Sequence, residues 1–441
     1  MEIPLFEVEF DKSVNLVEPR QEADVQRYLT TEPGNGTTDV IVLAHGWNND
    51  MNDARTLFRG FLRELAAFVP AATRNVAAIG VLWPSKKFAA EELIPGGAAS
   101  ATGGPLEPVL RAQIDTFEAA LDNPSAAAGI ARLRELLPRL EGDRAAQVEF
   151  VRTAGTLLSA QADGRQAAPE EGSARIEDRD GPALLADLAR PLPRVQAAQA
   201  ATGGAASLGS AAAAAPSGGA AGLGTAFSSL TAGALRLLNL TPYYVMKDRA
   251  GAVGRDGLNP LLGRLQDAVP NTIRFHLAGH SFGGRLVTAA VDGSHLLRIH
   301  TLLLLQAAFS HNGFAARYDG THDGFFRNVV AQRKVAGRIL VTHSIRDRAV
   351  GQAYPLASRL NGESAASFGG PDDRFGGIGR NGAQHVSDLS RELPLQAANR
   401  PYTFDPGAQI FNLNADNIIM DHSDIVRPET AWALAQSAFS A

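Results

Sequence analysis

The segment from Ile273 to Val291 constrains the fold of this chain more than any other. An apolar run, Ile273–Ala278, leads into the sequence GHSFGG (residues 279–284), and a helical pattern follows from Gly283. Glycines on both sides of a serine permit a sharp, strained turn, because side chains there would collide with neighbouring backbone. The pattern predicts a buried strand that passes directly into a helix. It also predicts that the hydroxyl of Ser281 is exposed at the carboxyl end of that strand, above the amino terminus of the helix.

Residues 38–84 predict a strand, a helix and a second strand in that order. Thr38–Ala44 and Val76–Trp83 are β-branched and aliphatic runs. Between them, apolar residues recur at three- and four-residue steps, which indicates a helix capped by Asn52 or Asp53 and ended by Pro70. These apolar positions are Leu57, Phe61, Leu62, Leu65 and Phe68. A strand, a helix and a strand in succession are typical of a parallel βαβ unit.

The alternation of strands and helices resumes near residue 254. Strand-like apolar runs cover residues 301–305, 338–342 and 408–413, and helical patterns cover residues 258–269 and 428–439. The amino terminus alternates apolar and acidic residues, which predicts an edge strand. We therefore expect an α/β fold built on a doubly wound, mostly parallel sheet.

A large insertion interrupts this alternation from residue 86 to residue 249. It contains helical patterns over residues 130–140 and 145–158, and then becomes rich in alanine, glycine and serine. We expect residues 1–85 and 250–441 to form one α/β domain, with residues 86–249 inserted as a helical cap.

The low-complexity part of the insertion, Val195–Leu235, carries no charged residue. Scattered glycines, Pro216 and the small apolar surface of alanine argue against a membrane span. We interpret this segment as a lid or loop, with a flap that touches a membrane surface or an acyl chain as the alternative.

The composition excludes several classes of protein. The 441 residues include no cysteine, which rules out disulfides, thiolate nucleophiles and cysteine-bound metal centres. The 41 Lys and Arg nearly balance the 46 Asp and Glu, so a dedicated nucleic-acid surface is not expected. The acidic amino terminus resembles neither a signal peptide nor a transmembrane segment, and we expect a cytoplasmic protein.

A serine hydroxyl needs an oriented base to become a nucleophile at neutral pH. In a strand–turn–helix site of this kind the base comes last in the chain, which leaves His385 and His422. His385 ends a glycine-rich stretch, whereas His422 lies between the last predicted strand and the last predicted helix. We therefore predict that His422 is the base of Ser281.

An acid is expected to orient the imidazole and to stabilise its protonated form. Asp347 leaves the predicted strand 338–342, so its carboxylate lies at the same sheet edge as the serine. Asp323 and Asp421 are alternative candidates for the acid. If Asp347 has no catalytic role, we expect it to form a surface ion pair with Arg346 or Arg348.

Stabilisation of a developing oxyanion needs two hydrogen-bond donors. We predict the backbone N–H groups of Phe282 and Trp47 for this role. His45 and Gly46 precede Trp47 at the end of the strand 38–44, and we expect these two residues and His280 beside the substrate.

These residues together resemble the α/β-hydrolase superfamily of serine esterases, lipases and thioesterases. The resemblance covers residues 38–84 and 240–440, includes the sequence YYVMKDRAGAVG (residues 243–254) and FGGPDD (residues 368–373), and leaves out the rest of the insertion. It implies Ser281 as nucleophile, His422 as base, Asp347 as acid, and the Trp47 and Phe282 amides as oxyanion hole. Family members carry their caps at other places in the chain, so the resemblance does not transfer a substrate.

The function that follows is cleavage of carboxylic esters or thioesters without a cofactor. An apolar acyl group is favoured, because Trp47, Phe282 and Leu286 are expected at the border of the site. The alternative is a binding or scaffolding protein that keeps the fold without turnover. No metal site is expected: His322-Asp323, and Asp372-Asp373 with His385, lack diagnostic spacing.

Overall fold

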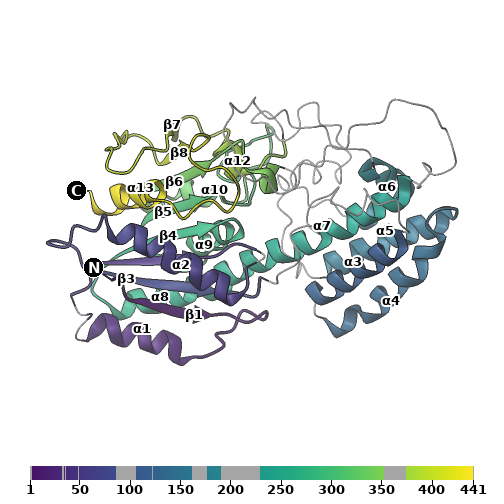
Figure 1. Ribbon diagram of the computed structural model, residues 1–441, viewed down its shortest axis with the longest axis horizontal. Coiled ribbons are helices and arrows are strands. Elements are labelled where there is room, and N and C mark those ends of the chain that lie inside the picture. Colours follow the sequence, from purple (N-terminus) through teal and green to yellow (C-terminus); the bar gives the residue numbers. More distant parts are fainter. Residues whose placement is uncertain are drawn as a thin grey trace, which may run out of the picture.

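One sheet of eight parallel strands organises the α/β part of the chain (Figure 1). Its strand order is β1-β3-β2-β4-β5-β6-β8-β7, and every neighbouring pair runs parallel. The expected α/β class with a parallel sheet is therefore confirmed. The strands are β1 (Leu5–Glu9), β2 (Asp39–Ala44), β3 (Val76–Leu82), β4 (Arg274–His280), β5 (Ile299–Leu305), β6 (Val335–His343), β7 (Ser390–Pro394) and β8 (Ile410–Asn414). This computed structural model describes residues 2–31, 34, 36–47, 49–85, 106–121, 123–160, 176–189, 229–351 and 374–440.

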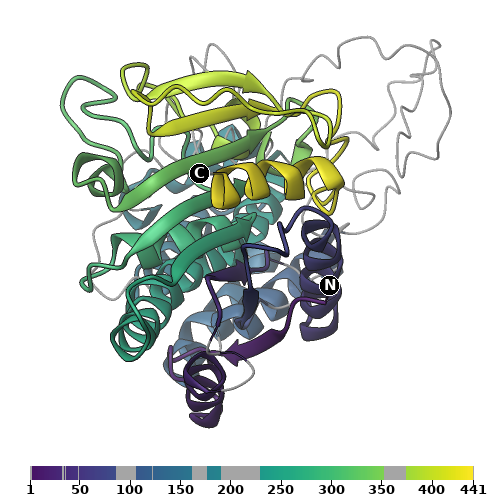
Figure 2. The same cartoon turned by 90° about the vertical axis from the view of Figure 1, so that its left-hand side faces the viewer.

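Helices cover both faces of the sheet, as a doubly wound arrangement requires (Figure 2). Strand β2 shows why, since its side chains alternate between two apolar clusters. Val40 and Val42 belong to one cluster, and Ile41 and Leu43 to the other. The first face carries α1 (Arg20–Thr30), α8 (Asn259–Ala268) and α9 (Phe282–Asp292), and the second carries α2 (Met51–Ala66) and α13 (Pro428–Phe439). Two short helices, α10 (Arg327–Ala331) and α12 (Ile378–Asn381), lie in the connections.

The start of α2 differs from the prediction. Asp50 is the N-cap, and its side chain accepts hydrogen bonds from the backbone N–H groups of Asn52 and Asp53. The Asp53 carboxylate accepts in return from the Asp50 N–H, which completes a capping box. Asn52 and Asp53 therefore lie inside the helix. The buried face of α2 also differs, since Phe58 is fully buried and Leu57 only partly.

The described part of the insertion is helical, as expected. It contains α3 (Leu106–Leu121), α4 (Ala127–Leu136), α5 (Arg144–Ser159) and α6 (Gly181–Ala189). Figure 1 shows these helices grouped at one end of the molecule, with α7 (Ser229–Ala252) running from them to the helices beside the sheet. Most of the predicted lid, residues 195–228, lies outside the described residues, and residues 229–235 begin α7.

Helix α7 joins the insertion to the sheet without a break. It continues through a π-helical turn (Val253–Leu258) into α8, so the predicted domain boundary at residues 249 and 250 falls inside a continuous helix. Arg249 donates hydrogen bonds to the carbonyl oxygens of Pro84, beyond β3, and Ala120, at the end of α3, at 3.0 Å each. Side chains from α3, α7 and α9 also share one apolar cluster. The insertion is thus packed against the α/β part by both polar and apolar contacts.

Candidate active site

Ser281 occupies a strained turn between β4 and α9. Its φ is 56° and its ψ is −124°, a conformation that residues with a side chain rarely adopt. The turn is fixed by its own backbone: the Ser281 N–H donates to the carbonyl of Leu305 at 3.1 Å, and the Ala308 N–H donates to the Ser281 carbonyl at 3.0 Å. This turn follows a strand and opens a helix, as the sequence predicts.

The glycines on either side of Ser281 are required by close backbone contacts. A Cβ atom at Gly279 would lie 2.2 Å from the Gly283 carbonyl oxygen. A Cβ atom at Gly283 would lie 2.3 Å from the Ala44 carbonyl oxygen, at the end of β2. Neither backbone atom can move away as the end of a flexible side chain can, so both positions admit only glycine.

A hydrogen-bonded chain links Ser281 to His422 and Asp347. The Ser281 Oγ lies 2.9 Å from His422 Nε2, and His422 Nδ1 lies 2.8 Å from Asp347 Oδ2. A carboxylate can only accept, so Nδ1 carries the hydrogen and donates it to Asp347. The Nε2 lone pair then accepts from the serine hydroxyl. The structure thus brings together the three side chains that the sequence suggested, in the order that base chemistry at the serine requires.

The alternative residues lie in other hydrogen bonds. His385 Nδ1 lies 2.7 Å from Asn312 Oδ1. Asp323 accepts from the backbone N–H of Arg317, and Asp421 accepts from that of Ser423. None of these three contacts involves Ser281 or His422, so the geometry favours His422 and Asp347 over them.

The surroundings of His422 favour its protonated form. Burial of the ring by itself lowers the pKa, but the charge and the hydrogen bond of Asp347, with the charge of Asp421, outweigh burial. The net result is a pKa of His422 above its ordinary value of 6.5. Because the Asp347 side chain has no exposed surface, its charge reaches the ring with little screening by water. The imidazole is therefore a stronger proton acceptor than a free histidine.

Gln306, which was not predicted from the sequence, completes the surroundings of the acid. It follows β5 directly with a φ of 44°, and its side-chain amide donates to Asp347 Oδ2 at 3.3 Å and to the Gly379 carbonyl at 2.9 Å. The hydroxyl of Thr342 donates to its Oε1 at 3.0 Å, and the Val350 N–H donates to Asp347 Oδ1 at 3.0 Å. A polar residue directly after four consecutive leucines was the available signal.

His45 is buried beneath the loop that carries Trp47. The Trp83 N–H donates to His45 Nε2 at 3.2 Å, so Nδ1 carries the hydrogen and donates to the Gly46 carbonyl at 2.9 Å. The C=O and N–H of a trans peptide point in opposite directions, so the Trp47 N–H is directed away from the His45 ring. Burial lowers the pKa of His45 to about 4, which keeps the ring neutral. His45 was expected beside the substrate, but its ring has no exposed surface and instead orients the loop.

Gly46 and His280 lie against the serine turn. A Cβ atom at Gly46 would lie 2.8 Å from the Ser281 Cβ and 2.9 Å from His280 Nδ1. His280 was expected beside the substrate, yet it is only 5% exposed, and its Nε2 lies 2.8 Å from the His422 carbonyl oxygen. It therefore contacts the loop that carries His422.

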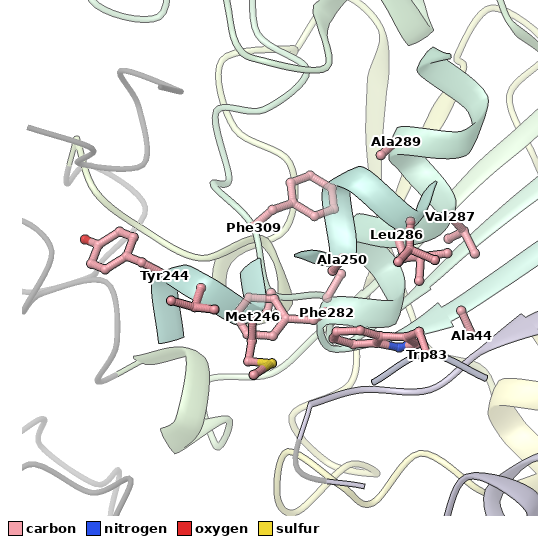
Figure 3. Packing of buried hydrophobic residues seen from close by; sticks show 14 of the residues in the cluster. Ala44, Trp83, Tyr244, Met246, Ala250, Phe282, Leu286, Val287, Ala289 and Phe309 are labelled. Atoms are coloured by element: carbon pink, nitrogen blue, oxygen red, sulfur yellow. The ribbon is translucent and has the colours of Figure 1, made fainter. Parts of the chain in front are cut away.

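Aromatic rings from three segments meet next to the serine turn. The ring centroid of Trp47 lies 5.8 Å from that of Phe282 and 6.2 Å from that of Tyr243 on α7, and Tyr243 lies 5.1 Å from Phe282. Trp47 and Tyr243 are partly exposed, whereas Phe282 and Leu286 belong to the buried cluster that Figure 3 shows. Of the residues expected at the border of the site, Trp47 is thus partly exposed, whereas Phe282 and Leu286 are buried.

In the described part of the chain, no group of three or more His, Asp or Glu side chains is arranged to hold a metal ion. His322 Nδ1 lies 2.8 Å from Asp319 Oδ2, and Asp372 and Asp373 lie outside the described residues. Among the described helices, none has the length and apolar character needed to cross a bilayer. Comparisons with protein-family models, with curated proteins and with solved structures find no match to this chain.

Proposed function

We propose that this protein is a serine hydrolase of the α/β-hydrolase fold that cleaves carboxylic esters or thioesters. The observation that carries the proposal is the chain of hydrogen bonds from Asp347 through His422 to Ser281. The strained backbone of Ser281, at the carboxyl end of a central strand, supports the role of nucleophile. No cofactor is needed for this chemistry.

The reaction follows from the directions of these hydrogen bonds. The Ser281 Oγ attacks the carbonyl carbon of the substrate while its proton moves to His422 Nε2. The tetrahedral intermediate collapses to an acyl-enzyme, and His422 gives the proton to the departing alcohol or thiol. Water then attacks the acyl carbon, His422 takes a proton from it, and collapse releases the acid and returns the proton to Ser281. Asp347 holds the imidazole in the required tautomer throughout.

The oxyanion of each tetrahedral intermediate needs two donors. We assign them to the N–H of Phe282, the first residue of α9, and the N–H of Trp47. The hydrogen bond from His45 to the Gly46 carbonyl supports the second assignment, because it turns the Trp47 N–H away from the His45 ring. Each donor of this kind contributes roughly 3–4 kcal/mol to catalysis.

The substrate is proposed to carry an apolar acyl group, and the insertion to act as a cap. Trp47 and Tyr243 are partly exposed residues whose rings lie close together next to Ser281, and Tyr243 comes from α7. Since α7 leads directly from the insertion to the site, we propose that helices α3 to α6 border the path of the acyl group.

Hydrolysis of p-nitrophenyl esters with acyl chains of graded length tests the proposal. The wild type is expected to turn over, with a preference among chain lengths, and Ser281→Ala is expected to lose turnover. A fluorophosphonate probe should label the wild type at Ser281. Equal hydrolysis by the wild type and by Ser281→Ala, or a wild type that remains unlabelled, would refute a serine hydrolase. The unlabelled outcome would indicate a binding protein instead.

A further inference from the structure

We propose that His280 is a positioning residue that holds His422 against the serine turn through the main chain of His422. The inference rests on the proposed function, since positioning has meaning only if His422 is the base. His280 is the last residue of β4 and precedes Ser281, while His422 follows β8. The two histidines come from strands that are not neighbours in the sheet, so a direct contact between them fixes a distance that the sheet alone does not.

The contact is a hydrogen bond with a defined direction. His280 Nε2 lies 2.8 Å from the His422 carbonyl oxygen, and a carbonyl oxygen only accepts. His280 Nε2 therefore carries the hydrogen. The bond attaches the backbone of residue 422 to the end of β4, next to the hydroxyl that the His422 ring must reach. The His422 ring is held through its Nδ1 by Asp347, which follows β6. The backbone and the ring of His422 are therefore fixed by residues that come from different strands.

The other side of the His280 ring faces the loop that carries Trp47. A Cβ atom at Gly46 would lie 2.9 Å from His280 Nδ1 and 3.3 Å from its Cε1, so the ring fits against the bare Cα of a glycine. Nδ1 is buried and has no hydrogen-bond partner among the described residues. The His280 ring thus lies between two loops and spaces them around Ser281: the loop with the proposed oxyanion donor on one side and the loop with the base on the other.

Histidine suits this place because the ring stays neutral. Burial, reinforced by the nearby His422 ring, lowers the pKa of His280 to about 3. The ring centroids of His280 and His422 are 4.9 Å apart, so a charged His280 would repel the imidazolium that forms on His422. A neutral ring donates the positioning hydrogen bond without this repulsion.

Two substitutions separate positioning from packing. His280→Leu keeps an apolar side chain of similar size and removes the donor, whereas His280→Gln places an amide N–H close to the former Nε2. His276→Gln is the matched control, because His276 lies on the same strand and is also buried but is hydrogen-bonded to Asp39. Fluorophosphonate titration counts the active sites in each sample, and kcat per active site is then compared with the wild type, together with KM and the melting temperature.

We expect His280→Leu to lose about 10²-fold in kcat per active site, as a base displaced by about 1 Å would, with little change in KM. His280→Gln should restore most of that rate, and His276→Gln should keep the wild-type rate. A His280→Leu protein that turns over at the wild-type rate per site would overturn the role of His280. Equal losses in His280→Leu and His280→Gln would overturn it too, because the donor would then be irrelevant.

A second measurement does not depend on turnover. ¹⁵N spectra of histidine-labelled protein at pH 7, with the His280 signal assigned by its loss in His280→Gln, should show the neutral ring protonated at Nε2. A ring protonated at Nδ1, or at both nitrogens, would contradict the inference even if His280→Leu failed to fold. A wild type without esterase activity but with the Nε2–H form would refute the proposed function and leave only the hydrogen bond from His280 to the His422 carbonyl.

Discussion

Gly46 offers a sharp test of how the loop beyond β2 serves the site. An alanine Cβ at this position would lie 2.8 Å from the Ser281 Cβ, whereas carbon atoms in contact are about 3.5–4.0 Å apart. Something must therefore move by about 0.7 Å or more. Ser281 is held by backbone bonds to Leu305 and Ala308, so the loop that carries Trp47 is expected to move instead.

The expected loss follows from that displacement. If the Trp47 amide is an oxyanion donor, moving it by this amount removes most of its hydrogen bond. Loss of one such donor lowers kcat by about 10²–10³-fold, or about 3–4 kcal/mol of barrier lowering. Overpacking is expected to cost about 1–3 kcal/mol of folding stability as well, so the two effects must be measured separately.

The assay is kcat per fluorophosphonate-labelled site, with urea unfolding on the same samples. Gly142→Ala is the control, since a Cβ at Gly142, in the turn before α5, meets nothing within 4 Å. Gly142→Ala should match the wild type in both measurements. A folded Gly46→Ala protein with an unchanged kcat would show that the loop carries no oxyanion donor, and that part of the mechanism would be wrong.

Other perturbations test the remaining parts of the site. Asp347→Asn should lower kcat by about 10⁴-fold, because the amide favours the wrong tautomer of His422, and a loss below tenfold in steady-state assays would contradict this. Because the pKa of His422 is raised above 6.5, kcat/KM should rise with pH through an inflection above 6.5. Asp347→Asn should move that inflection to lower pH. An inflection below 6.5 in the wild type would argue against the pairing of His422 with Asp347. Gln306→Leu removes a donor to Asp347 and should lower kcat without changing KM, which steady-state kinetics checks. Because the pKa of His45 is lowered to about 4, the unfolded chain binds a proton at His45 at a higher pH than the folded protein does. As pH falls from 6.5 towards 4, the free energy of unfolding of the wild type should therefore decrease by up to about 3 kcal/mol, and that of His45→Asn should not. Urea unfolding at pH 7 and pH 4.5 measures this difference.

The sequence predicts most of the sheet because its central strands are buried on both faces. Such strands are continuous apolar runs, and β2, β3, β4 and β5 were all expected within about two residues of their ends. Strand β7 (Ser390–Pro394) was missed, because it lies at the edge of the sheet and is mostly polar. Helix α1 was also missed, since its sequence buries only Val25 and Leu29.

The sequence predicts some residues of the candidate site and not others, and the reason is again physical. Ser281, His422 and Asp347 were suggested because each follows a strand at one edge of a parallel sheet, where chain order restricts the choice. The roles of His45, His280 and Gln306 depend instead on which nitrogen faces which oxygen after folding. No pattern of apolar residues encodes that, so the sequence placed the two histidines beside the substrate and did not mark the glutamine.

At position 281 the backbone adopts a conformation that glycine tolerates better than serine. The strained conformation costs about 1–3 kcal/mol, which exceeds the roughly 0.5–1 kcal/mol that glycine loses through its freer unfolded chain. Ser281→Gly should therefore melt at a higher temperature than the wild type while being inert, and a lower melting point would mean that the turn is relaxed. Architecture alone gives no reason to keep a hydroxyl there, so the identity of this single residue separates a working member of this fold from a vestigial one.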